Sequence, residues 1–537
     1  MAIAPLSLKN DYWQNFEVKE NDLQFLYSYL LDVEKPQNTQ ELLGALIDER
    51  IREEIISLKK QQMAGGPVYY PKDHYQVGQT IQIPALNWQS GKVTAARPGQ
   101  NPEMAAFEVI EVALENGETR QFAAGLEEHK LNQPVSINAD DPLLNRDNVL
   151  ENYGEMLTER LSDILENNPD LVRIAAMWFP RALLVDINGG QLNMAEAVLD
   201  MLAGGPLSTP GLMDQIDLPE DAGGKLNEFS LNLALQEDKR FDEVGPSGEV
   251  LWFLHRMEPE PVRETPVYLR YYKDSHLVDT SLAEDVNTML QQLGPQVVDE
   301  LEQNLHPLSG KRPEEVTLSL IYPHLRAGTL PLIGTLSKLF PTAFESPRIQ
   351  FTFVDGNSSE KFSGWVVRPN HYVYGLREWY LSQSLIAGSL IHVRRGKIPG
   401  EMIIRADKKR ATREWLRTAI VASDGGVVFS MLKHNLAAAV DERMSIVVSD
   451  AALLDKIWDR QLKQRVPLAQ TVRQVMGVLA KQSPQNHVHA EELYAGVNIL
   501  RRCPPGPILS LLQESAWAKH LGNLYFRLED TSGGEKA

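Results

Sequence analysis

One pattern recurs three times along this chain, and that repetition constrains the fold more than any other feature. Each copy has two or three short amphipathic helical segments, followed by a pair of strand-like runs joined by a tight turn. This order of helices and a hairpin is typical of a winged helix-turn-helix. The repetition therefore points to a non-enzymatic protein that grips nucleic acid or other proteins.

The clearest copy covers residues 193–254. Asn193 is expected to cap its first helix, because an Asn side chain accepts hydrogen bonds from the unpaired amides of a first helical turn. Two further helices are expected, one that opens at Thr209 and one over residues 225–235. Strand-like runs on either side of the Gly-Pro-Ser-Gly turn at 245–248 predict a hairpin that closes the module.

A second copy closes the chain and a third, weaker copy opens it. The second has expected helices at 466–479, 489–497 and 507–515, and strand-like runs at 517–521 and 524–528. The third has expected helices at 23–31, 39–47 and 49–60. A β-rich segment is expected to displace the hairpin of this third copy.

Three segments of the clearest copy resemble a known family. They are the Ala-Glu-Ala-Val-Leu run at 195–199, the Gly-Pro-Leu-Ser-Thr turn at 205–209, and the run at 235–241 before a Gly-rich hairpin that ends in Trp-Phe-Leu at 252–254. Together they resemble the HARE-type winged helix, a family that includes the N-terminal domain of the RNA polymerase delta subunit and domains attached to chromatin and restriction proteins. The resemblance implies association with DNA or transcription, although members of the family do not all bind DNA directly.

A second resemblance involves a predicted small β-barrel. Strand-like runs lie at 316–320, 348–354, 364–368, 390–393 and 401–405, with a Gly-Leu-x-Glu-Trp-Tyr helix between two of them. This order resembles the DNA-binding pseudobarrel of plant B3 domains and of some restriction-enzyme effector domains. The resemblance implies DNA recognition by loops on one rim of the barrel, where Arg394, Arg395 and Lys397 would lie. Trp379 and Tyr380 are expected to be core aromatic residues.

The remaining β-rich segment and the linkers complete the expected organisation. Alternating runs at 79–83, 91–95, 107–114 and 119–123 predict a small SH3-like barrel. We expect an α+β multidomain protein in which winged-helix domains are combined with small β-barrels. The expected domains are a winged-helix-like domain at 1–65, an SH3-like barrel at 66–130, an acidic helix plus HARE-like winged helix at 147–265, a B3-like pseudobarrel with a basic region at 311–410, an α/β connecting segment at 411–463 and a C-terminal winged helix at 464–530.

Positive charge is concentrated at 360–417, in a chain whose formal net charge is −19. Affinity for duplex DNA depends on cations that neutralise phosphates, so the distribution of charge matters more than its total. Residues 408–417 are expected to be helical, and this would place three of the cations on one face. The expected DNA-binding residues are Arg394, Arg395, Lys397, Arg405, Lys408, Lys409, Arg410, Arg413 and Arg417. The alternative is that these are ordinary surface charges that pair with acidic segments.

Negative charge is concentrated at 140–170, where carboxylates recur every four residues on a predicted helix. This spacing places them along one slowly drifting face. An acidic face of this kind is either a solvated surface, a docking surface for a basic partner, or a guard that lies over the protein's own basic region. The candidate partner-binding residues are Asp147, Glu151, Glu155, Glu159 and Asp163.

Composition excludes several kinds of protein. No run approaches the roughly 20 apolar residues that span a bilayer, and acidic residues occupy the region where a secretory signal would be apolar, so a cytoplasmic protein without membrane contact is expected. The single cysteine, Cys503, excludes an internal disulfide and a cysteine-based zinc site, and a structural role is expected for it.

Known catalytic patterns are also missing. Neither a phosphate-binding loop nor a dinucleotide fingerprint occurs, and no cofactor is expected. His487 and His489 with Glu492 have no further ligand at a recognisable spacing, so a structural role at the start of a helix is expected and no metal ligands are assigned.

Two classes of function remain. The first is a DNA-binding protein of transcription regulation or genome defence, in which several winged helices and the basic barrel combine modest contacts with double-stranded DNA. The second is an acidic interaction scaffold that docks or sequesters a basic protein or a component of the transcription machinery without direct DNA binding. Charge distribution narrowly favours the first.

Overall fold

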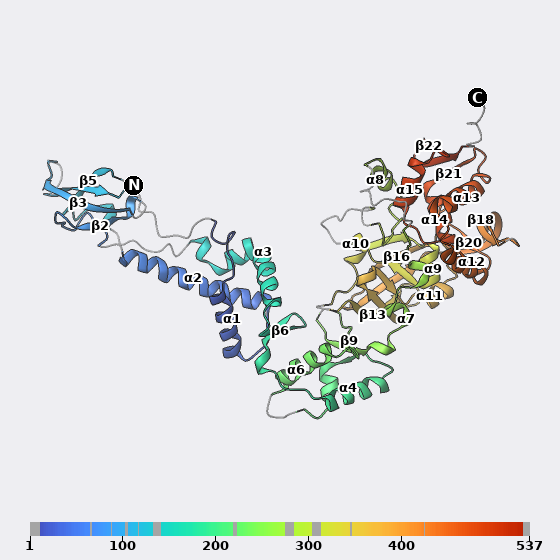
Figure 1. Cartoon of the computed structure of the whole chain (residues 1–537), viewed down its shortest axis with the longest axis horizontal. Coiled ribbons are helices and arrows are strands. Elements are labelled where there is room, and N and C mark those ends of the chain that lie inside the picture. Colours follow the sequence, from blue (N-terminus) through green and yellow to red (C-terminus); the bar gives the residue numbers. More distant parts are fainter. Residues whose placement is uncertain are drawn as a thin grey trace. The chain divides into compact units, whose positions relative to one another are not determined.

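The chain forms two compact units, Met1–Val185 and Asp186–Ala537, in a computed structural model (Figure 1). The structure describes residues 11–64, 67–86, 89–101, 106–115, 117–132, 141–218, 223–246, 248–273, 284–302, 305, 313–343, 346–423 and 425–529. Helices and small sheets alternate in both units, so the protein belongs to the α+β class.

One arrangement of elements occurs once in the first unit and twice in the second. A helix leads into a short strand, two helices follow, and a hairpin then closes the module. The last strand of the hairpin pairs antiparallel with the short strand, and therefore lies in the centre of each three-stranded sheet. We call these three arrangements the N-terminal, middle and C-terminal modules.

The N-terminal module is interrupted by a long insertion. Its helices are α1 (Glu20–Val33), α2 (Thr39–Ala64) and α3 (Arg146–Glu166), and its strands are β1 (Gln37–Asn38), β6 (Leu171–Ile174) and β7 (Met177–Pro180). Leu42 and Leu46 of α2 share one buried cluster with Leu157 and Leu161 of α3 and Trp178 of β7. This shared core fixes α3 as the third helix of the module.

Two expectations for this region are wrong. The predicted helix at 49–60 is the continuation of α2, because no glycine or proline interrupts the chain there and the side chain of Asp48 pairs with Arg146. The acidic helix does not join the following module, as a domain at 147–265 would require, because its apolar face packs in the first unit. The hairpin is present, and the chain reaches it only after the insertion.

The insertion is a four-stranded antiparallel meander. Its strands, in the order that they pair, are β2 (Thr80–Ile83), β3 (Gln89–Pro98), β4 (Glu108–Leu114) and β5 (Thr119–Ala124). Ile81, Ile83, Ile110 and Val112 are buried in its separate core. The four predicted strands are confirmed, and closure into an SH3-like barrel stays a prediction.

The middle module opens the second unit. Its elements are α4 (Gly189–Met201), β8 (Leu207–Ser208), α5 (Thr209–Met213), α6 (Gly224–Glu237), β9 (Phe241–Glu243) and β10 (Leu251–Leu254). The expected cap at Asn193 is wrong. Asn188 caps α4 instead, because its side chain accepts from the amides of Gly190 and Gln191, and the Gln191 side chain completes a capping box.

A seven-stranded mixed sheet follows and curls into half of a barrel. In the order that they pair, its strands are β11 (Glu315–Ser319), β16 (Leu390–Arg395), β17 (Glu401–Ala406), β13 (Arg348–Asp355), β14 (Lys361–Val367), β15 (Tyr372–Tyr374) and β12 (Thr329–Pro331). The short helices α9 (Tyr322–Ala327), α10 (Gly334–Ser337) and α11 (Arg377–Ser382) accompany it. The expected strands are confirmed, and Trp379 and Tyr380 are buried as expected.

A long hairpin connects this sheet to the C-terminal module. It consists of β18 (Lys408–Val421) and β19 (Val427–Ala438), and β20 (Val447–Val448) adds a short parallel strand. The expected helix at 408–417 is therefore wrong. Four-residue spacing brings Arg413 and Arg417 to the same side of a strand as well as of a helix, so charge spacing alone could not separate the two conformations.

The C-terminal module ends the chain. It contains α13 (Leu468–Ala480), β21 (His487–His489), α14 (Ala490–Leu500), α15 (Pro505–Glu514), β22 (Ala518–Gly522) and β23 (Tyr525–Leu528), and α12 (Ala451–Gln464) precedes it. Two further helices, α7 (Glu260–Arg263) and α8 (Glu284–Gln291), lie between the middle module and the half-barrel in sequence. Figure 1 shows α8 near α15.

A buried ionic network joins the C-terminal module to the half-barrel. The fully buried guanidinium of Arg502 contacts Asp299 at 2.6 Å and Glu300 at 2.9 Å. Glu300 also accepts from His324 of α9 at 2.8 Å, while Tyr494 of α14 donates to Asp299 at 2.6 Å. Burial acts to raise the pKa of Glu300, but the Arg502 and His324 charges hold it below its usual range. Each buried charge of the network is therefore stabilised by its neighbours, and removal of one residue would leave the others buried without a counter-charge.

We expect Arg502→Ala to lower the free energy of unfolding by about 3–5 kcal/mol, because two buried carboxylates lose their cation. Denaturant unfolding of the full chain, followed by circular dichroism, measures this change. Lys481→Ala, which removes an exposed cation from the same module, serves as the control and should alter stability by less than about 0.5 kcal/mol. Equal effects of the two variants would contradict the assigned role of Arg502.

Glu302 lies beside this network, and burial together with the charge of Asp299 raises its pKa to about 7. A carboxyl with a raised pKa stabilises the folded state at low pH and loses this contribution as pH rises through the folded pKa. We expect Glu302→Gln to gain stability relative to the parent chain between about pH 5 and about pH 8. Thermal unfolding across this range tests the sign, with the exposed Glu514→Gln as control. Parallel profiles for parent and Glu302→Gln would contradict the expectation.

Candidate nucleic-acid interface

The first group of predicted DNA-binding residues lies at one end of β16 and in the following turn. Arg394 and Lys397 are exposed. Arg395 donates instead to the backbone carbonyls of Leu339 at 2.7 Å and Lys338 at 2.8 Å, which anchors the turn. All three residues are exposed, but Arg395 is held by these hydrogen bonds, and Arg394 lies opposite Glu315 of β11 in register without forming an ion pair.

Arg405 lies on β17 in a local ionic cluster. Its guanidinium is 3.1 Å from Asp407 and 3.6 Å from Glu315. His392, its cross-strand partner, contacts the same two carboxylates. Arg405 therefore has two anionic partners already, and its charge is largely balanced within the sheet.

The second group of predicted residues lies along β18. Lys409 pairs with Glu414 at 2.8 Å, and Arg417 pairs with Glu492 of α14 at 3.1 Å. Lys408, Arg410 and Arg413 are exposed. Thus two of the five predicted residues on this strand support the fold, and three are directed to solvent.

Five of the nine predicted cations remain available: Arg394, Lys397, Lys408, Arg410 and Arg413. Within the described ranges, no carboxylate lies at ion-pair distance from any of the five. Arg394 pairs in register with Ile403, and Lys408 follows five residues later, so the two groups begin roughly 16 Å apart along the chain direction. They form two basic patches rather than the single region that the sequence indicated.

The hairpin also carries a cation that the sequence reasoning missed. Lys433 of β19 lies opposite Trp415 of β18, and its ammonium group is 5.0 Å from the centre of the indole ring. Trp415 is 60% exposed, so this pair is on the surface. The β19 sequence has no polar–apolar alternation, since the polar residues Lys433, His434 and Asn435 are consecutive, so the sequence offered no local signal for this pair. We use the name hairpin patch for the exposed basic residues of this hairpin, Lys408, Arg410, Arg413 and Lys433, together with Trp415; a register irregularity separates Lys408 from Thr412 and the residues that follow.

The third helices of the modules do not present a comparable surface. In a helix-turn-helix, the later helix of the pair enters the major groove and contacts bases and phosphates. The α15 helix contains no lysine or arginine, and α6 contains one lysine and two glutamates. The α3 helix exposes all five candidate partner-binding carboxylates: Asp147, Glu151, Glu155, Glu159 and Asp163. Phosphate contacts therefore do not come from these helices.

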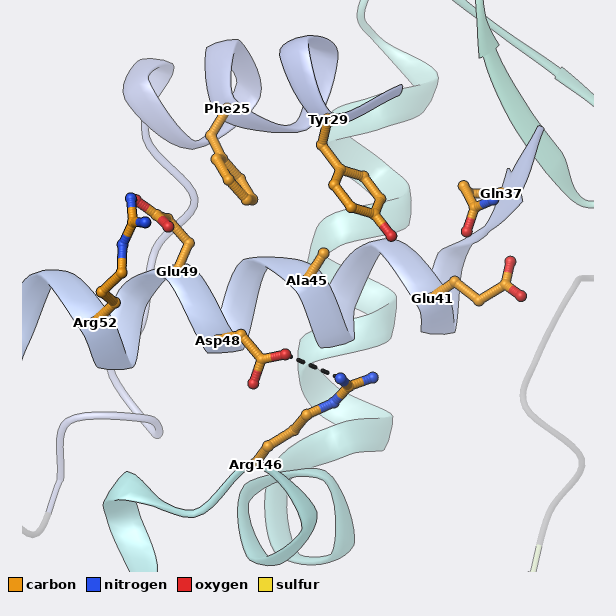
Figure 2. Close-up of a pocket in the computed structure, with 9 residues that line it drawn as sticks. All are labelled: Phe25, Tyr29, Gln37, Glu41, Ala45, Asp48, Glu49, Arg52 and Arg146. Atoms are coloured by element: carbon orange, nitrogen blue, oxygen red, sulfur yellow. Dashed lines mark hydrogen bonds and ion pairs between the residues drawn. The ribbon is translucent and has the colours of Figure 1, made fainter. Parts of the chain in front are cut away.

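A cleft of about 440 Å³ lies between α1 and α2 of the N-terminal module (Figure 2). Phe25 and Tyr29 of α1 point toward α2, with ring centres 6.2 Å apart. Glu41 of α2 lines the same cleft, whereas Glu49 is paired with Arg52 at 2.7 Å and Asp48 with Arg146 at 2.9 Å. The two aromatic faces and Glu41 suit a cationic side chain, although the other two carboxylates of the lining already have arginine partners.

Residues considered for metal binding or catalysis have structural roles. His489 caps α14, because its ring nitrogen accepts from the amide of Glu491, and Glu492 completes the capping box. Cys503 is buried. No helix in the described part of the chain is long and apolar enough to cross a bilayer.

No protein-family model matches this sequence, and neither a curated protein nor a solved structure is detectably similar to it.

Proposed function

We propose that this protein is a non-enzymatic DNA-binding protein of transcription regulation or genome defence. One observation carries the proposal: five predicted cations on the β16–β17 turn and on β18 face solvent without a carboxylate partner among the described residues. Exposed, unpaired arginine and lysine side chains are the groups that neutralise phosphates. Their concentration in an otherwise acidic chain is what favours a polyanionic ligand.

The repeated module supports the same proposal. All three copies place a short strand against the last strand of a hairpin behind three helices, as a winged helix does. The middle module also coincides with the segment that resembles the HARE-type winged helix. The half-barrel with its short helices is compatible with the resemblance to B3-like pseudobarrels, whose loops read DNA.

The proposed mode of binding differs from insertion of a recognition helix. The hairpin of the middle module is covered, since Val244 and Phe253 are buried with Trp365 and Tyr372 of the half-barrel. Contacts are therefore assigned to the β16–β17 turn and to the hairpin patch. Two modest patches on one chain gain affinity by linkage, because binding of the first raises the effective concentration of the second.

A second candidate function is favoured by the first unit. Five exposed carboxylates on α3 have no cationic partner within the residues that the structure describes, and a cleft lined by Phe25, Tyr29 and Glu41 lies in the same module. Such surfaces repel DNA and attract basic segments of proteins. In this alternative, the chain is an acidic scaffold that docks or sequesters a basic transcription or defence factor.

Replacement of the available cations tests DNA binding. We expect Arg394→Ala/Lys397→Ala and Lys408→Ala/Arg413→Ala each to weaken binding of the full chain to random duplex DNA. Each lost phosphate contact should reduce the slope of log K against log salt concentration by about 0.9, so each double variant should lose about 2. Fluorescence anisotropy across a salt series measures both effects.

The matched control is Lys463→Ala/Lys481→Ala, which removes one exposed cation from α12 and one from the C-terminal end of α13. It should leave the salt slope unchanged. Failure of the parent chain to bind DNA at low salt, or equal slopes for all variants, would refute the proposed DNA interface.

Neutralisation of the acidic helix tests the scaffold alternative. If α3 docks basic segments, Glu151→Gln/Glu155→Gln/Glu159→Gln should weaken binding of a lysine- and arginine-rich peptide by about tenfold, since each exposed pair contributes up to about 1 kcal/mol. Titration calorimetry on the full chain measures the affinity. Glu115→Gln/Glu127→Gln/Glu128→Gln, three exposed changes in the meander region, should leave it unchanged. Equal affinities for both triple variants would exclude α3 as the docking face.

A further inference from the structure

Three potential metal ligands converge where the middle module meets the half-barrel. Asp242 lies on β9, His255 begins the short turn after β10, and Glu258 follows three residues later, just before α7. His255 Nδ1 is 2.7 Å from Asp242 Oδ2 and 3.5 Å from Glu258 Oε2. One ligand atom from each residue lies within 4.8 Å of the others.

Glu258 is the unusual member of this cluster. Its side chain is fully buried, and neither carboxylate oxygen has a hydrogen-bond partner among the described residues. Arg348 and His255 each lie 3.5 Å from Glu258 Oε2, which is ion-pair distance without a hydrogen bond, so the buried carboxylate has room for a closer cationic partner.

Arg348 of β13 reaches the cluster but does not satisfy it. Its Nη1 atom is 2.9 Å from Asp242 and 3.4 Å from His255 Nδ1. It is 3.5 Å from Glu258, to which it makes no hydrogen bond. A planar guanidinium cannot approach three convergent ligands at once as a small spherical ion can. The Arg348 side chain is 21% exposed, so it has a path toward solvent.

We propose that Asp242, His255 and Glu258 bind a divalent transition-metal ion, Zn²⁺ in the first place, at the position that Arg348 Nη1 occupies. One imidazole nitrogen and two carboxylate oxygens form a ligand set that suits zinc. Ligand bonds of about 2.0–2.2 Å place neighbouring ligand atoms about 3.4 Å apart in a tetrahedral arrangement. The observed separations of His255 from Asp242 and from Glu258, 2.7 and 3.5 Å, lie on either side of this value, and all three ligand atoms are within 4.8 Å of one another.

The environment of the site indicates what the ion does. Asp242 and His255 are each partly exposed, which leaves room for water at the remaining coordination position. Next to the ligands, the amide of Gln350 donates to the carbonyl of Val244 at 2.8 Å, and Phe253 contacts Trp365 edge to face at 5.3 Å. The ion would lock the hairpin of the middle module onto the half-barrel. This inference does not depend on DNA binding.

Titration calorimetry on the full chain, after removal of metals with a chelator, tests the proposal with ZnCl₂. We expect one zinc ion per chain for the parent protein. Glu258→Gln, a change that preserves shape and removes the charge, should weaken zinc binding on the order of 100-fold, and His255→Ala should do the same. Glu249→Gln on the same hairpin is exposed and should bind like the parent.

Arg348→Gln tests the same site through a gain of zinc affinity, without removing a proposed ligand. Removal of the competing cation should strengthen zinc binding, and zinc should raise the thermal unfolding temperature of this variant more than that of the parent. Absence of stoichiometric zinc binding in both parent and Arg348→Gln would overturn the proposal. Undiminished binding in Glu258→Gln would overturn it as well, as would binding of MnCl₂ in the absence of any zinc binding.

Discussion

The buried guanidinium of Arg502 is the constraint on which the architecture of the second unit depends. It is held by Asp299 and Glu300, which belong to the segment before the half-barrel, and through Glu300 it is linked to His324 on α9. Because burial of each charge is costly on its own, the C-terminal module, this segment and the half-barrel must be in place together. The network thus couples the folding of these three parts more strictly than an apolar contact of similar area would.

A second junction, largely apolar, determines which surfaces remain for ligands. The middle module packs its hairpin against β14 and β15 through Phe253, Trp365 and Tyr372. A hairpin that is covered in this way cannot serve as a free wing. Because α15 has no cation and α6 has one lysine against two glutamates, the β16–β17 turn and the hairpin patch remain as the basic surfaces. The proposed ligand contacts are thus assigned to the basic surfaces that packing between the modules and the half-barrel leaves exposed.

Local signals in the sequence predicted most elements but not their partners. Turn chemistry at Gly522-Asn523 and proline at the start of α15 placed the C-terminal module to within a few residues. The third helix of the N-terminal module was misassigned because 81 residues separate Ala64 from Arg146, and no local pattern spans such a gap. The candidate metal ligands were equally hidden, since Asp242 and His255 meet only through the β9–β10 pairing. Ion pairing of Arg405 and Arg417 likewise depends on tertiary contacts.

The insertion between α2 and α3 has a consequence for synthesis of the chain. When α1 and α2 leave the ribosome, Leu42 and Leu46 have no α3 to cover them, and the meander must be translated before Leu157 appears. At about 5–20 residues per second, the nascent protein carries this bare apolar stripe for several seconds. The meander has a core of its own and can fold during that interval. The delay before this stripe is covered therefore arises from the order in which the elements are translated rather than from the finished fold.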